Sequence, residues 1–169
     1  MPDLAPFDPA RVFETLARHE VEFVLVGALA ARLQGFPRMT ADADLTPANS
    51  PENLERLSAA LRELHARVYT ESVPEGLAFA CTGKALARGE IWNLVTDAGR
   101  VDIIRHPVGV SGYDELRAHA VRFELHGAPL FAASLGDILR CKEAADRPQD
   151  RQDAVIIREM LIADQRSAE

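Results

Sequence analysis

The stretch from Phe23 to Leu45 constrains the fold of this chain most strongly. It begins with an apolar, largely β-branched run that is typical of a central strand buried on both faces. Gly27 ends this run, and a short apolar helical segment follows, which Gly35 and Pro37 interrupt. Backbone N–H groups at such a turn can hold phosphate oxygens. The alternative is a tight turn that only connects strand and helix.

Two carboxylates, Asp42 and Asp44, lie two residues apart in the segment that follows. Alternate residues of a strand point to the same face, so both side chains are expected side by side. Their charges repel each other unless a cation lies between them. Hard divalent ions such as Mg²⁺ prefer oxygen ligands and bring phosphates with them. The pair therefore predicts a metal–phosphate site, and the alternative is two solvated acids at a strand end.

A third carboxylate, Asp102, stands inside the β-branched run 101–104. A charge in the middle of a buried strand is unfavourable unless it has a partner. Two readings remain open for this position. Either Asp102 forms an ion pair with Arg100 or Arg105, or it is a third metal ligand beside the strand that carries the first two carboxylates.

Capping residues, prolines, glycines and hydrophobic periodicity predict the other elements. We expect helices over 9–18, 28–33, 51–65, 113–119, 135–145 and 150–164. We expect strands over 21–26, 38–46, 68–70, 91–96, 101–104, 121–125 and 129–131, where 38–46 is the second strand or the approach to it. The inner face of the last helix is expected to carry Val155, Ile156, Met160 and Leu161. Segment 74–89 is either a hairpin or a mobile loop, with acceptor binding as one role.

Composition indicates an ordinary soluble globular protein, because 47% of the 169 residues are apolar and 27% are charged. We expect one domain over 1–169, with a helical C-terminal part of about 134–169. Cys81 and Cys141 form no C-x-x-C motif, which favours reduced thiols in the cytoplasm. No apolar run is long enough to cross a membrane, and no signal peptide is apparent. The net charge of −7 argues against unspecific nucleic-acid binding but allows a local basic pocket.

The ordered set of buried strand, glycine turn, Asp-x-Asp and later carboxylate resembles the nucleotidyltransferase superfamily, whose palm is like that of DNA polymerase β. Here Gly27-Ala28 precedes Asp42-Ala43-Asp44 at the long edge of the family's spacing. The resemblance is nearest to small bacterial nucleotidyltransferase-like proteins that include the AbiEii toxin group. It covers about residues 20–160 and implies an α/β or α+β palm with a mixed sheet and packed helices.

Two further patterns are similar to those of the AbiEii group. An R-x-T-x-D-x-D approach leads into the acidic pair, and a K…R-x-x-D-x-x-D pattern lies near the C-terminus. Their members in this chain are Arg38, Thr40, Asp42 and Asp44, and then Lys142, Arg147, Asp150 and Asp153.

The resemblance implies transfer of a nucleoside monophosphate from an NTP such as ATP to an acceptor hydroxyl. Asp42 and Asp44 would hold two Mg²⁺ ions, and Asp102 would hold the ion that activates the acceptor. The residues implied to bind the nucleotide are Gly27, Ala28, Arg38, Lys142 and Asp150. The alternatives are an ion pair of Arg38 with a neighbouring acid, a solvated Lys142, and capping of the last helix by Asp150 and Asp153. The acceptor would be RNA, a protein or a small molecule, and an antitoxin or a second copy would be the protein partner.

Ala28 departs from the family pattern, in which a serine at this position holds a terminal phosphate oxygen. Backbone N–H groups can do the same work. The departure favours a second hypothesis, a catalytically weak nucleotide-binding or interaction protein with a degenerate site. A third hypothesis is an acidic structural domain without a site, in which Asp102 is drawn away from the other carboxylates by an ion pair.

Overall fold

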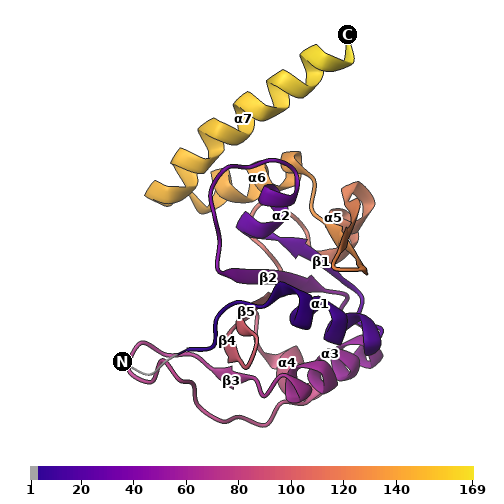
Figure 1. Ribbon diagram of the computed structural model, residues 1–169, viewed down its shortest axis with the longest axis vertical. Coiled ribbons are helices and arrows are strands. Elements are labelled where there is room, and N and C mark those ends of the chain that lie inside the picture. Colours follow the sequence, from indigo (N-terminus) through magenta and orange to yellow (C-terminus); the bar gives the residue numbers. More distant parts are fainter. Residues whose placement is uncertain (1–3) are drawn as a thin grey trace.

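In the computed structural model, which describes residues 4–169, seven strands form one mixed sheet in the order β3-β4-β5-β2-β1-β7-β6 (Figure 1). Their bounds are β1 Phe23–Val26, β2 Asp42–Pro47, β3 Arg67–Val68, β4 Ile91–Thr96, β5 Gly99–Ile104, β6 Val121–Leu125 and β7 Ala128–Ala132. Strand β2 pairs antiparallel with β1 and parallel with β5. The two strands that carry aspartates are therefore immediate neighbours, as the metal-ligand reading of Asp102 requires.

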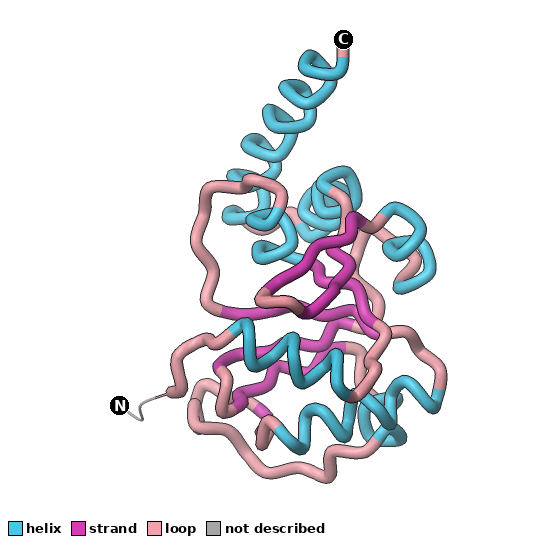
Figure 2. The backbone as a smooth tube through the Cα atoms, turned by 45° about the vertical axis from the view of Figure 1, so that its right-hand side comes forward, coloured by secondary structure: helices cyan, strands magenta, loops and turns pink. Residues whose placement is uncertain are grey.

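Seven helices in the same described range surround the sheet (Figure 2). Their bounds are α1 Pro9–Arg18, α2 Gly27–Leu33, α3 Pro51–Glu63, α4 Gly83–Arg88, α5 Tyr113–His119, α6 Leu135–Ala145 and α7 Pro148–Ala168. Helices α1 and α4 pack against α3, whereas α2 and α7 pack against α6. Figure 1 shows these two groups on opposite sides of the central strands, with the C-terminal half of α7 projecting from the body.

Alternation along β2 decides which way its carboxylates point. Ala43 and Leu45 are fully buried, and Leu45 lies on the face that α3 covers with its leucines. Asp42 and Asp44 take the alternate positions and are only partly buried. Since side chains of a strand alternate between faces, both carboxylates point away from α3, toward α2 and α6.

Helix starts follow the predicted capping signals closely. Asp8, Ser50 and Ser134 each accept a hydrogen bond from a backbone N–H of the first turn. Proline occupies the first turn of α1 and α3. Most other differences from the expected elements are shifts of boundaries. One of these is β2, which begins at Asp42 because residues 38–41 form the connector that leads into the strand.

Segment 74–89 is neither a hairpin nor a mobile loop throughout, because 83–88 form helix α4. Thr82 caps this helix by accepting a hydrogen bond from the N–H of Ala85. Gly83 marks close packing rather than a loop, since a Cβ there would lie 2.9 Å from the backbone nitrogen of Glu55 on α3. Helix α4 thus lies on the side of the sheet away from Asp42 and Asp44.

The last helix differs from its expected bounds, and one of its four expected inward residues is exposed. It runs from Pro148 to Ala168, so Pro148 starts α7 in addition to separating it from α6. Ile156, Met160 and Leu161 pack against the core as expected, whereas Val155 is 51% exposed. The buried positions are Asp150, Asp153, Ala154 and Ile157, so the buried face begins with two carboxylates that an apolar pattern does not reveal. Despite the length of α7, no helix within 4–169 has the apolar stretch needed to span a membrane.

Asn53 on α3 joins the two central strands. Its side chain accepts a hydrogen bond from the N–H of Glu22, just before β1, and donates to the carbonyls of Glu22 and of Ala48, just after β2. The residue is fully buried. Its amide therefore holds the end of β2 beside the start of β1.

Asn53→Ala is expected to lower the free energy of unfolding by about 3 kcal/mol, because it leaves the N–H of Glu22 and the carbonyl of Ala48 without partners in a buried place. The carbonyl of Glu22 keeps its hydrogen bond from the N–H of Ala48. Urea denaturation measures this change. Asn49→Ala is the control, since Asn49 is exposed and accepts one hydrogen bond, from Arg105. Equal losses in the two variants would contradict the role given to Asn53.

Candidate active site

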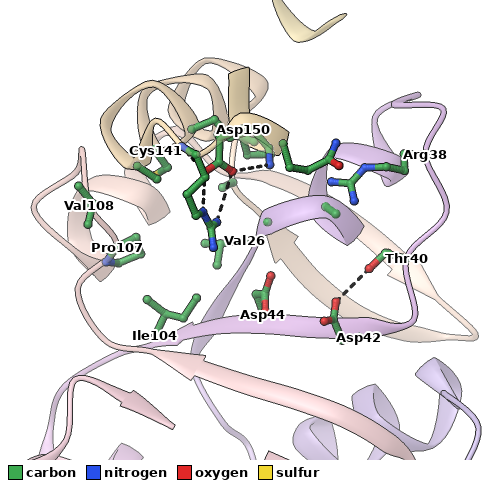
Figure 3. Close-up of a pocket in the computed structure, with 18 of the residues that line it drawn as sticks. Val26, Arg38, Thr40, Asp42, Asp44, Ile104, Pro107, Val108, Cys141 and Asp150 are labelled. Carbon is green, nitrogen blue, oxygen red and sulfur yellow. Dashed lines mark hydrogen bonds and ion pairs between the residues drawn. The ribbon is translucent and has the colours of Figure 1, made fainter. Parts of the chain in front are cut away.

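Three carboxylates converge on one face of the sheet. Asp42 and Asp44 come from β2, and Asp102 comes from β5, where it lies opposite Asp44 in the parallel register. Oxygen atoms of the three side chains lie within 4.8 Å of one another. Figure 3 shows Asp42 and Asp44 rising from β2 into a pocket below Asp150. The structure therefore brings together the three residues that the sequence singled out. Asp102 also lies 3.6 Å from Arg100, the ion pair that the sequence offered as the alternative, yet it stays beside the other two carboxylates.

Burial and mutual repulsion make it unfavourable for these three carboxyl groups to be ionised together. Burial, followed by repulsion from Asp42 and Asp102, raises the pKa of Asp44 to about 7. Burial also raises the pKa of Asp102, although Arg100 opposes the change. The Oδ1 atom of Asp102 is buried without a hydrogen-bond partner. A hard divalent cation would supply the positive charge and the oxygen coordination that these side chains lack, so the residues fit such an ion.

Gly27 makes room for this carboxylate group. Its φ of +71° is unfavourable for residues with a side chain, and a Cβ there would lie 2.2 Å from Oδ2 of Asp44. Gly27 begins α2, and Val26 before it provides no side-chain cap. The glycine that the sequence marked as a phosphate turn is thus also the residue that lets the Asp44 carboxylate approach the backbone.

The pocket over the carboxylates has a volume of about 1040 Å³. Its walls differ in character, as Figure 3 shows. One side is apolar and includes Ile104, Pro107, Val108 and Cys141. The other side is polar and includes cationic residues of the connector before β2 and of the α6–α7 junction, namely Arg38, Lys142 and Arg147. Gly27 and Ala28 also line it. Such a division suits a ligand with one apolar and one anionic end.

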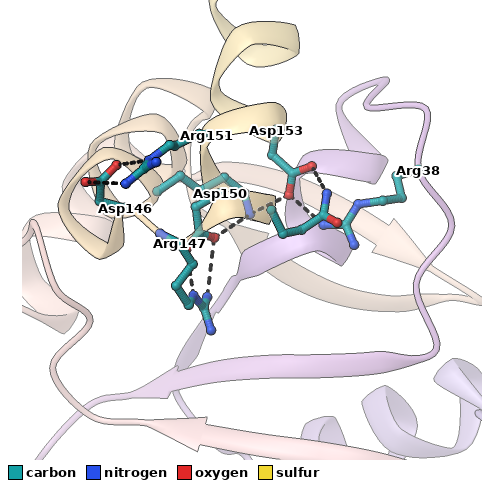
Figure 4. A network of polar contacts seen from close by, with 8 residues as sticks. Arg38, Asp146, Arg147, Asp150, Arg151 and Asp153 are labelled. Carbon is teal, nitrogen blue, oxygen red and sulfur yellow. Dashed lines mark hydrogen bonds and ion pairs between the residues drawn. The ribbon is translucent and has the colours of Figure 1, made fainter.

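Two buried aspartates of α7 hold the cations of the polar wall (Figure 4). Asp153 lies 2.8 Å from Nζ of Lys142 and 2.6 Å from a guanidinium nitrogen of Arg38. Asp150 lies 3.5 Å from the same lysine nitrogen. Burial opposes ionisation of both acids, but the surrounding cations hold each pKa below its ordinary value. Arg38, Lys142 and Asp150, predicted to bind nucleotide, are thus joined in one network at the pocket.

Arg147 is a pocket residue that was absent from the predicted site. Its Nε donates to Asp150 Oδ2 at 2.6 Å, while its side chain is 76% exposed. Figure 4 shows the guanidinium extending from the start of α7 toward the strands. The R-x-x-D spacing contained the signal, because an acid three residues into a helix can bind back to its first residues. Here Asp150 accepts hydrogen bonds from both the backbone and the side chain of Arg147.

No family model matches the chain, and no curated protein matches it. Among solved structures it is similar to TM1012 of Thermotoga maritima, which is provisionally designated a nucleotidyltransferase. The identity is 17% and the TM-score 0.51, over 90% of this chain and 89% of that one. It is also similar to the antibiotic-resistance factor ANT(2'')-Ia, with 15% identity and a TM-score of 0.49, over 94% and 91% of the two chains.

The likeness to TM1012 shows that this chain has the nucleotidyltransferase fold, a mixed sheet with packed helices. This confirms the fold class that the order of sequence motifs predicted. The grouping with the AbiEii toxins stays a prediction, as do the roles of the individual site residues.

Asp44→Asn is expected to become more stable relative to wild type as the pH rises. With a pKa of about 7, folded Asp44 retains a proton that the unfolded chain has released at pH 5. Wild-type stability therefore falls between about pH 4 and 7 through this residue, by about 2 to 3 kcal/mol between pH 5 and 8. Urea denaturation of both proteins at these two pH values measures the difference. A stability difference that is the same at both would contradict the raised pKa.

Gly27→Ala and Gly127→Ala form a matched pair, because both positions have positive φ but only Gly27 faces Asp44. We expect each variant to lose about 1–2 kcal/mol of stability from backbone strain. Only Gly27→Ala should also displace the Asp44 carboxylate and weaken Mn²⁺ binding. Thermal denaturation and Mn²⁺ titration separate the two effects. Unchanged Mn²⁺ binding by Gly27→Ala would show that Asp44 does not need this close approach.

Proposed function

We propose that this protein is a metal-dependent nucleotidyltransferase that moves a nucleoside monophosphate from an NTP to an acceptor hydroxyl. The observation that carries the proposal is the group of three carboxylates within 4.8 Å of one another, on two neighbouring strands of this fold. Asp42, Asp44 and Asp102 would hold divalent ions, for which we propose two Mg²⁺. Bound there, such ions lower the pKa of the acceptor hydroxyl and offset phosphate charge.

In the reaction, the acceptor oxygen forms a bond to the α-phosphorus and the bond to the departing pyrophosphate breaks. Asp102 lies at the acceptor end of the carboxylate group in this proposal, where it receives or directs the hydroxyl proton. Its raised pKa, caused mainly by burial, suits that role. Thr40 donates a hydrogen bond to Asp42 Oδ1 at 2.9 Å and so fixes the orientation of that carboxylate.

The polar wall of the pocket suits the triphosphate. Arg147 presents an exposed guanidinium whose orientation is fixed by Asp150. Lys142 and Arg38 add positive charge to the same wall, although both form ion pairs with Asp153. The backbone N–H groups at Gly27 and Ala28 would serve where the serine hydroxyl of the family is missing.

The apolar wall suits the nucleoside. Ile104, Pro107 and Val108 offer a surface for a planar base, and the half-buried Cys141 completes it. Burial raises the pKa of the Cys141 thiol to about 11, so this cysteine is neutral at physiological pH and does not act as a nucleophile. The side chains of this wall carry no charge that would select one base.

The acceptor we propose is a protein or a small molecule, with an RNA end as the third possibility. RNA stays open as an acceptor through a basic cluster in the sequence, formed by Arg140, Lys142, Arg147 and Arg151. This cluster is largely neutralised, because Arg140 pairs with Glu115 and Arg151 pairs with Asp146. Membership of the AbiEii toxin group, with an antitoxin or a second copy as partner, remains part of the proposal, as does a cytoplasmic location.

The alternative is a nucleotide-binding protein with weak or no catalysis. Ala28 favours it, because this residue offers no hydroxyl to a terminal phosphate. A protein of this kind would bind NTP and metal without releasing pyrophosphate.

Incubation with each α-labelled NTP, Mg²⁺, and pools of tRNA, cell protein and small hydroxyl compounds tests both functions. We expect wild type to label one pool, and Asp42→Asn and Asp102→Asn to lose at least about 100-fold of that activity. Asp114→Asn is the control, since Asp114 is exposed on α5, outside the pocket.

The outcome distinguishes the proposals. Stabilisation of wild type by NTP and Mg²⁺ without label transfer supports the alternative, and gain of transfer by Ala28→Ser would then identify the missing group. If wild type shows neither label transfer nor stabilisation by NTP and Mg²⁺, both proposed functions, the enzyme and the nucleotide-binding protein, are wrong.

A further inference from the structure

Two atoms at the edge of the site stand out by their lack of partners. Among residues 4–169, the buried side-chain nitrogen and oxygen atoms without a hydrogen bond are Nε of Arg100 and Oδ1 of Asp102. These residues lie two apart on β5 and point to the same face. A buried polar atom without a partner destabilises the folded chain, by about 1–3 kcal/mol. Two such atoms side by side, next to the carboxylate group, indicate that this part of the structure serves a function other than stability.

The guanidinium of Arg100 is held between an aromatic ring and the acids. Its Cζ lies 4.0 Å from the centre of the Tyr69 ring. The backbone N–H of Tyr69 donates to the carbonyl of Asn93 on β4, which fixes the ring beside the sheet. On the other side, Nη2 of Arg100 lies 3.6 Å from Oδ1 of Asp102, too far for a hydrogen bond. In the parallel register Arg100 also lies opposite Asp42.

We propose that Arg100 competes with the divalent ion for Asp102, so that this residue sets how tightly the acceptor-side ion binds. The inference rests on the proposed function, in which Asp102 is a metal ligand. The guanidinium approaches the same oxygen that has no other partner, and its charge has the same sign as that of the ion. Ligation through Oδ1 therefore requires Arg100 to withdraw from Asp102.

The surroundings allow such a movement. The ring of Tyr69 attracts the cation through its face and supports the guanidinium when the carboxylate is occupied by an ion. The ion pair is also long, so little hydrogen bonding is lost when it opens. Arg100 thus offsets the repulsion among the acids when no ion is bound, and weakens ion binding at Asp102 until the negative charge of a substrate is present.

The test is calorimetric titration with Mn²⁺ at pH 8, where Asp44 is ionised, without nucleotide. We expect Arg100→Gln to bind Mn²⁺ roughly tenfold more tightly than wild type, because a nearby like charge is removed. Arg100→Lys keeps the charge and should stay within about threefold of wild type. Arg122→Gln is the matched control: it removes the same charge from β6, where Arg122 forms an ion pair with Glu124.

A double variant makes the test specific to Asp102. In an Asp102→Asn background, Arg100→Gln should give no further gain, because the competing ligand is already absent. A gain that persists there would overturn the inference in favour of a general effect on the other acids. If Arg100→Gln does not fold, Arg100→Met replaces it, since its apolar side chain can still pack on the Tyr69 ring.

The failure of this inference differs from the failure of the proposed function. If wild type binds Mn²⁺ and Arg100→Gln binds it equally or more weakly, the competition is wrong and the metal site stands. If neither protein binds Mn²⁺, both are overturned. If Arg100→Gln binds Mn²⁺ more tightly than wild type, and this gain disappears in the Asp102→Asn background, the result supports both the competition and the metal site.

Discussion

Mutual repulsion among three partly buried carboxylates is the constraint on which the rest of this structure depends. A chain does not gather Asp42, Asp44 and Asp102 within 4.8 Å for stability. Neighbouring strands in parallel register place them there, and Gly27 leaves the space that the Asp44 carboxylate needs. The raised pKa of Asp44 shows that ionising this carboxyl group is unfavourable here. Such strain at one place in an otherwise well-packed fold is typical of a site whose chemistry needs it.

The sheet and its helices divide two tasks between its faces. Ala43 and Leu45 of β2 lie in the core beneath α3, whereas the alternate residues of the same strand face the pocket. One strand therefore contributes to stability through one face and to chemistry through the other. Asn53 connects these tasks, because its amide fixes both central strands from the core side.

Much of this arrangement could be predicted from the sequence, because it depends on local signals. Period-two alternation and the glycine turn placed Asp42 and Asp44, and capping residues such as Ser50 placed the helix starts. Helix α4 was missed because its glycine, Gly83, serves packing against α3 instead of a turn. The position of Arg100 was beyond reach for another reason. Its partner ring, Tyr69, comes from a distant segment, and only the register of β4 and β5 brings the two together.

The burial of Asp150 and Asp153 on α7 was also missed, and these acids change how the pocket should be viewed. The polar wall carries three positive charges, on Arg38, Lys142 and Arg147. Two negative charges, on Asp150 and Asp153, offset most of them, so the net charge of this wall is about +1. The wall therefore attracts anions only weakly at long range. At short range it selects them through the fixed orientation of its hydrogen-bond donors. Association of an NTP with this pocket would then depend only modestly on ionic strength, and selection would come from how a phosphate fits between fixed donors rather than from attraction to a basic surface.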